Sequence, residues 1–189
     1  MANTNAPRGF IPTRTLGGGT PQRSSGYKIA TGYSSSIFRG DPVKTAGTDR
    51  TIALATVGAL ILGVFDGCSY TAADGSVIYS PYWPASTTAT NIIAYVYDDP
   101  STIFEIQVDD TAGLIATDVG QNIDFISGVG SAATGQSAYQ ADQSTLGSGA
   151  DIGLKVYALV DRPDNAYGQY AKALVLINEH EHKATVAGV

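Results

Sequence analysis

The sequence predicts an all-β protein, a small barrel or a sandwich. Two apolar runs, residues 51–57 and 59–65, have the length of strands and are rich in Thr, Ile and Val, which suit a pleated surface better than a helix. Turn signals surround them: Gly-Asp-Pro at 40–42 and Asp-Gly at 66–67 and 74–75. The chain also has 22 glycines and only 15% charged residues. We therefore expect the two runs to form the hairpin-built core of a small barrel.

The length of 189 residues favours a single β domain, which we place at residues 27–189, preceded by an extended N-terminal arm at residues 1–26. The arm is rich in Asn, Thr, Gly, Pro and Ser. Because fixing one backbone residue costs about 1–2 kcal/mol, we expect a segment of this composition to be disordered or to lie along another chain. Its candidate contact residues are Arg8, Phe10, Ile11, Arg14 and Arg23.

The clearest hairpin is predicted between residues 91–97 and 102–108, joined by an Asp-Asp-Pro-Ser turn. Residues 171–178 are mostly apolar and are expected to form a central strand. The segment 113–151 is the loosest part of the domain: residues 128–139 are rich in Gly, Ala and Ser and residues 142–149 are polar, so we expect a long surface loop or an excursion that faces a partner. Further strands are expected at residues 27–33, after Pro42 at a sheet edge, at 119–126 and at 154–162.

Charge is distributed unevenly along the chain, although the formal net charge is only −6. Residues 1–50 carry seven basic and two acidic groups, whereas the remainder carries four basic and fifteen acidic groups. This pattern favours an acidic partner for the start of the chain and argues against nucleic acid. The first residues, MANTNAPRGF, lack the apolar core of a signal peptide, and no apolar stretch is long enough to span a bilayer.

Few residues offer chemistry. His180 and His182 could share one face of an extended strand and chelate a metal, but too few further ligands accompany them, so we expect a solvated strand end. The acidic pairs 98–99 and 109–110 flank one strand, more than about 20 Å apart, and are expected to be turn residues rather than a glycosidase or calcium site. The sequence contains no P-loop, nucleophile elbow or dinucleotide fingerprint. We therefore expect no enzyme activity, no cofactor and no metal.

Three other features have simple structural interpretations. Cys68, the only cysteine, is expected to be a small buried residue rather than a reactive thiol. The adhesion tripeptide at residues 39–41 is explained by its turn. Trp83, next to Tyr79 and Tyr82, is expected to cap one end of the barrel, and the alternative is an aromatic platform for sugars.

The central block resembles the capsid decoration (cement) proteins of tailed bacteriophages. The residues that carry the resemblance are GDPV at 40–43, TIALATVGALILGVFDGCSY at 51–70 and SPYWPAS at 80–86, followed by AYVYDDPSTIFEIQVDD at 94–110, VGQNIDF at 119–125 and GQYAKALVLINEH at 168–180. The resemblance spans roughly residues 27–182. It implies a β-tulip-like or related small barrel, and an extended terminus that reaches over neighbouring subunits.

The resemblance also implies a function and partners. The expected partner is the major capsid protein, bound at the outer surface of the virion after assembly in the bacterial cytoplasm. A homo-oligomer is expected, with a trimer favoured, because several weak contacts then act together on a lattice of identical sites. No nucleic acid or membrane is expected as a partner. The alternative is a carbohydrate-binding or adhesion module of a virion, such as part of a tail spike or fibre.

Overall fold

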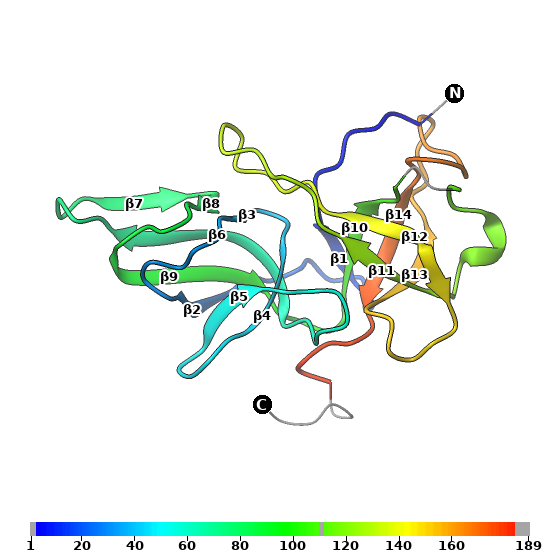
Figure 1. Ribbon diagram of the computed structural model, residues 1–189. Helices are drawn as coiled ribbons and strands as arrows, with labels where there is room; N and C mark the ends of the chain where they lie inside the picture. Colours follow the sequence, from blue (N-terminus) through cyan, green and yellow to red (C-terminus); the bar gives the residue numbers. More distant parts are fainter. Residues whose placement is uncertain (1–2, 110–111, 184–189) are drawn as a thin grey trace.

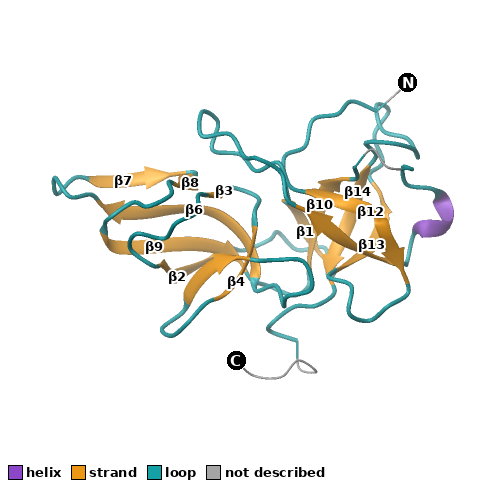
Figure 2. Cartoon of the chain, viewed as in Figure 1, coloured by secondary structure: helices purple, strands orange, loops and turns teal. Residues whose placement is uncertain are grey.

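The structure, a computed structural model, describes residues 3–109 and 112–183 and is almost entirely β, as the sequence predicts. The strands are arranged in two lobes that lie side by side (Figure 1). The only helical element among the described residues is a 3₁₀ turn, η1 (Ala116–Asp118), at the outer end of the second lobe (Figure 2). Each lobe has its own cluster of buried apolar side chains.

The first lobe is a closed five-stranded barrel. Its strands follow one another around the barrel in the order β4 (Pro42–Thr45), β5 (Thr51–Leu54), β2 (Ser24–Ile29), β9 (Thr90–Tyr97) and β6 (Gly63–Thr71), and a further pairing of β4 with β6 closes the ring. The hairpin strand β7 (Val77–Ser80) extends the sheet beyond β6, and the short pair β3 (Ile37–Phe38) and β8 (Tyr82–Trp83) packs nearby.

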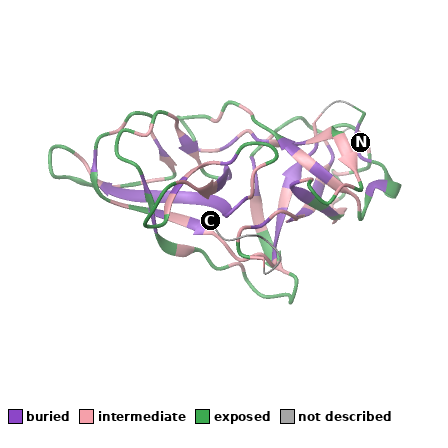
Figure 3. Ribbon diagram, turned by 60° about the horizontal axis from the view of Figure 1, so that its bottom comes forward, coloured by how far each residue is buried: buried purple, intermediate pink, exposed green. Residues whose placement is uncertain are grey.

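The second lobe is a six-stranded sheet. Its order is β1 (Ile11–Thr15), β10 (Thr102–Gln107), β14 (Lys172–Ile177), β13 (Leu154–Leu159), β11 (Asn122–Ile126) and β12 (Gln140–Gly147). A parallel bridge between Val108 and Ala141 joins the end of β10 to β12, so the sheet curls around its core. As predicted, residues 172–177 form a central strand, and this strand buries alternate side chains. In both lobes the buried residues lie mainly on strands (Figure 3).

Three segments cross between the lobes. The amide of Phe10 donates to the carbonyl of Gly40, at 2.9 Å. The loop between β11 and β12 reaches the first lobe. There the amide of Arg39 donates to the carbonyl of Gly135, and the amide of Ser137 donates to the carbonyl of Arg39. After β14, residues 179–181 pair with Ile61. We call the loop of residues 128–137 the strap.

Two predicted pairings are wrong, although the strands themselves exist. Strands β9 and β10 do not form a hairpin, because β9 belongs to the first lobe and β10 to the second. The runs 51–57 and 59–65 do not pair either, because β4 lies between β5 and β6. The segment 113–151 is not one long loop: it contains η1, β11 and β12, and its strap packs on the first lobe so closely that a Cβ on Gly130 would lie 2.3 Å from the Phe38 ring.

The N-terminal segment also differs from expectation, because its described residues lie on their own chain. Strand β1 pairs with β10, and Phe10 is only 2% exposed inside the core of the second lobe. The segment is ordered by tertiary contacts, namely the apolar contacts of Phe10 and the pairing of β1 with the edge of β10, and not by its own composition. The division of the chain into residues 1–26 and residues 27–189 stays a prediction. Strand β2 begins at Ser24, so it spans the predicted boundary.

Candidate functional site

A β-bulge places one acidic side chain at the junction of the lobes. In β6, Phe65 faces Val96 of β9 and Gly67 faces Tyr95, so Asp66 is the extra, bulged residue. Gly67 has a φ of +140°, which glycine adopts readily, and a Cβ there would lie 2.9 Å from the Ser80 carbonyl oxygen. A bulge turns a side chain away from the regular alternation of its strand. The bulge therefore directs a carboxylate out of a strand that is otherwise buried on both faces.

Two arginines hold this carboxylate. Nη1 of Arg23 donates to Oδ2 of Asp66 at 2.7 Å, and Nε of Arg39 donates to Oδ1 at 2.8 Å. The Asp66 side chain is 4% exposed, whereas those of Arg23 and Arg39 are 53% and 56% exposed. Each guanidinium has five N–H donors, so both keep donors that face solvent. The hydrogen bond with Asp66 raises the pKa of Arg23, which also lies 4.7 Å above the ring of Tyr95.

A cavity of about 320 Å³ opens beside Arg39 and Asp66. Its lining combines an apolar wall with Arg8, Arg39 and, from the strap, Gln136, whose side chains carry hydrogen-bond donors. A second hollow of about 370 Å³ is also lined by Arg39 and Asp66 and adds Arg23 and Tyr95. The two share Arg39 and Asp66, and we call them together the arginine groove. The apolar wall consists of Phe10, Ile11, Pro12, Val64 and Phe65.

The groove carries an excess of positive charge. Three arginines face a single carboxylate, and Arg8 makes no hydrogen bond or ion pair with any other described residue. Tyr97 lines the same cavity, and its pKa is raised by burial and by the nearby Asp66. The groove is therefore rich in hydrogen-bond donors, which is the arrangement that proteins use to bind carboxylates and phosphates.

The structure separates the five candidate contact residues of the N-terminal segment. Arg8, Arg14 and Arg23 are exposed, so their charges can reach a partner. Ile11 is half-buried on β1. Phe10 packs edge-on against Phe104 and Phe125, with ring centres 6.0 and 6.3 Å away, so it is a core residue and is not available for docking.

The histidines are not a solvated strand end. His182 is exposed, but His180 is fully buried, and its Nδ1 accepts a hydrogen bond from the amide of His182 at 3.0 Å. Burial lowers the pKa of His180 to about 4, so the imidazole is neutral at pH 7. Within the described part of the chain, no three His, Cys, Asp or Glu side chains lie close enough to hold a metal ion.

The other candidates are largely buried. Trp83 is completely buried and stacks edge-on with Tyr70, as expected for a residue that caps a core, and so cannot form a sugar platform with the exposed Tyr79. Burial raises the pKa of Cys68 to about 12, in agreement with an inert thiol. Asp41 of the adhesion tripeptide is 2% exposed and accepts from the amide of Phe38, so that tripeptide is not presented.

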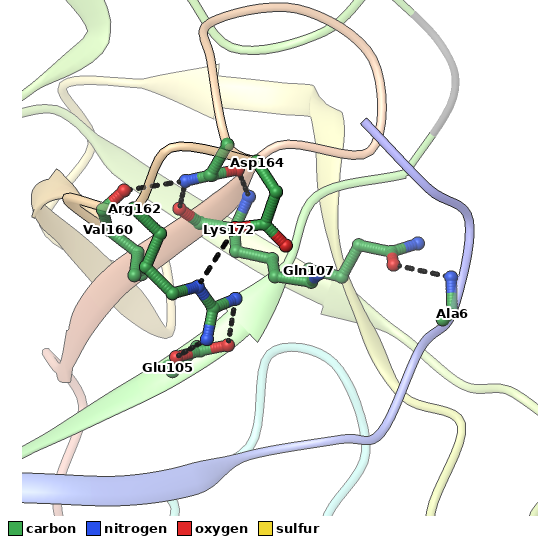
Figure 4. A network of polar contacts seen from close by, with 8 residues as sticks. Ala6, Glu105, Gln107, Val160, Arg162, Asp164 and Lys172 are labelled. Atoms are coloured by element: carbon green, nitrogen blue, oxygen red, sulfur yellow. Dashed lines mark hydrogen bonds and ion pairs between the residues drawn. The ribbon is translucent and has the colours of Figure 1, made fainter. Parts of the chain in front are cut away.

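A second cluster of polar and charged contacts lies beside the N-terminal segment, on β10 and the loop between β13 and β14 (Figure 4). Arg162 donates to both carboxylate oxygens of Glu105, at 3.1 and 3.4 Å, and lies 3.7 Å from Asp164. Nearby, the Gln107 side chain accepts from the amide of Ala6 at 2.8 Å. Arg162 is thus paired with two carboxylates, and the Gln107–Ala6 contact holds the N-terminal segment to β10. The Asp109 carboxylate accepts from the amide of Gln143 in β12 at 3.2 Å, and Asp110 lies outside the described residues.

Comparisons with known proteins give no match: no protein family, no curated protein and no solved structure is significantly similar to the chain. In the two described stretches, no helix has the length and apolar character needed to cross a bilayer.

Sequence reasoning identified Arg8 and Arg23 but missed Arg39 and Asp66 as members of one site. It interpreted Asp66-Gly67 as a turn, and the same dipeptide serves equally well in a bulge.

Proposed function

We propose that this protein is a phage head decoration (cement) protein, which binds the outer surface of the major capsid protein lattice and stabilises the mature capsid. The proposal starts from the sequence resemblance, and what supports it in the structure is the position of the GDPV motif. Gly40 has a φ of +95°, and a Cβ there would lie 2.9 Å from the Arg8 carbonyl oxygen. The motif is therefore the junction of the N-terminal segment, the strap and the first barrel, which is more specific than a generic turn.

The arrangement of charge also supports a docking role. The N-terminal segment is fixed to the second lobe, and it presents Arg8 and Arg14 to solvent from a rigid backbone. Exposed charges at the rim of an interface steer association and set its salt dependence. A closed oligomer, with a trimer favoured, would repeat these charges over several capsid subunits, so that modest contacts add up to stable attachment.

The test is saturable binding to mature heads of the phage that encodes the protein, measured by co-sedimentation and by cryo-electron microscopy of the decorated shells. Deletion of residues 1–26 is unsuitable, because it removes Phe10 from the core and β1 from the sheet. The double variant R8Q/R14Q keeps the core, and should weaken shell binding roughly tenfold at low salt, since each rim charge contributes up to about 1 kcal/mol.

The matched control is K28Q/K44Q, which removes two cations from the first-lobe strands β2 and β4, outside the N-terminal segment and the arginine groove. It should bind shells with the affinity of the wild type. Wild-type protein that fails to saturate mature shells at a fixed ratio to capsid subunits would contradict the proposed function. Equal losses in the two double variants would contradict only the assigned surface.

A further inference from the structure

We infer that the arginine groove is a binding site for a carboxylate, supplied by an acidic side chain of a protein partner or by a free small-molecule carboxylate. This inference does not depend on the capsid role. It assigns a ligand to a site whose internal contacts leave it incompletely neutralised.

The charge balance gives the sign of the ligand. Asp66 neutralises one of three guanidinium groups, so Arg8, Arg23 and Arg39 leave the groove with two excess positive charges. An internal ion pair would need only one arginine. Arg39 binds Asp66 through Nε, and it lines the cavity together with Arg8, whose side chain has no polar partner within the described residues.

The lining favours a carboxylate over inorganic phosphate. Asp66 is itself an anion within the groove, and it repels an entering group more strongly the more charge that group carries, so a carboxylate group with one charge is preferred over a phosphate dianion with two. The planar fork of a guanidinium group pairs with a carboxylate through two parallel hydrogen bonds. The apolar wall beside Arg8, formed by residues 10–12 and by Val64 and Phe65, provides contact for the hydrocarbon part of an acidic side chain and none for bare phosphate.

The position of the groove suits recognition of a partner. It is lined by five segments that are far apart in the sequence: the N-terminal segment, the turn between β3 and β4 that carries Arg39, the bulge of β6, the end of β9 and the strap. All five are held by backbone hydrogen bonds or sheet pairing, including the Phe10–Gly40 and Arg39–Gly135 bonds. A preorganised site loses little conformational entropy on binding.

The test is an NMR titration of the full-length protein that follows the arginine side-chain Nε–Hε signals at constant ionic strength. The probes are a blocked tetraglutamate peptide, glutarate, inorganic phosphate and, as the uncharged reference, a blocked tetraglutamine peptide. We expect saturable shifts of the Arg39 signal with tetraglutamate or glutarate, and none with tetraglutamine. Saturation by the peptide alone identifies a protein partner as the source, whereas saturation by glutarate identifies a small molecule.

Three variants make the result specific. R8Q removes an exposed cation that supports no internal contact, and should weaken binding roughly tenfold. K28Q removes an exposed cation of β2 that does not line the groove, and this variant should bind as the wild type does. D66N removes the Asp66 carboxylate, which competes with the ligand for the arginines, and should tighten binding. If the Asp66 ion pairs were only structural, D66N would not tighten binding.

Several outcomes would overturn the inference. One is the lack of any saturable shift; another is equal weakening by R8Q and K28Q, which would indicate non-specific attraction. Phosphate binding as tight as that of glutarate and the peptide would refute the preference for carboxylate. Should D66N fail to fold, the contrast between R8Q and K28Q alone decides, because neither residue holds a buried group.

Discussion

Replacement of Phe10 by Ala tests whether the N-terminal segment is part of the fold. The side chain is 2% exposed and contacts the rings of Phe104 and Phe125 edge-on. Loss of a buried phenylalanine ring removes its transfer free energy and leaves a cavity, which together cost about 3–5 kcal/mol. Whole domains are stable by only about 5–15 kcal/mol, so F10A should lower the free energy of unfolding by a large fraction.

The measurement is urea denaturation, followed with two probes because the lobes have separate cores. Fluorescence of Trp83, the single tryptophan, reports the first lobe, and hydrogen exchange of amides in β10 and β14 reports the second. F10A should lower protection in β10 and β14 most strongly. L16A is the control, because Leu16 is 51% exposed, and it should change stability by no more than about 0.5 kcal/mol.

The reasoning fails if F10A costs less than about 1 kcal/mol while amides of residues 11–15 exchange as fast as in an unfolded chain. Such a result would mean that the segment is a free arm in solution, as its composition first indicates. Ordering would then occur only on a partner, at about 1–2 kcal/mol for each residue fixed.

Three further changes have defined outcomes. Burial raises the pKa of Asp41 to about 6, above its ordinary 3.8, so its ionisation destabilises the fold as pH rises through 6; D41N should be more stable than wild type at pH 7.5 and remove that part of the pH dependence in thermal melts. His180 has the opposite pH dependence. Burial lowers its pKa from 6.5 to about 4, so the free energy of unfolding decreases as pH falls from 6.5 towards 4, and H180N should make this decrease smaller. G130A should cost about 1–3 kcal/mol and raise exchange in the strap, since its Cβ would meet the Phe38 ring; A132G, at the exposed tip, is the control.

Strand positions were predictable from the sequence because they depend on local alternation and turn residues. Most expected strands lie within a few residues of those observed, as β9 and β10 illustrate. Partner choice was not predictable, because it is decided by non-local contacts. The turn after β9 forms as expected, with Asp99 accepting from Ser101, but Asp98 accepts from Ser24 and Tyr27 of β2 and so keeps β9 in the first barrel while the chain passes to the second.

The candidate site was only half visible for the same reason. Its arginines stood out by charge, but what unites them is one carboxylate that a bulge brings out of a buried strand. A bulge depends on the register between β6 and β9, which no local pattern encodes. His180 was misread for a related cause: charged neighbours at 179–183 indicate solvent, yet this residue pairs with Ile61 of the other lobe and is covered by it.

Order in the N-terminal segment changes how docking must work. A segment that folds on contact uses part of its interaction energy to fix its own backbone, about 1–2 kcal/mol per residue. Here that cost is met within the chain, by Phe10 in the core and β1 on the sheet, before any partner arrives. In the proposed docking, the exposed charges of Arg8 and Arg14 would therefore contribute fully to association. Attachment would then depend on rigid presentation of charge, and its strength should follow ionic strength more than the length of the segment.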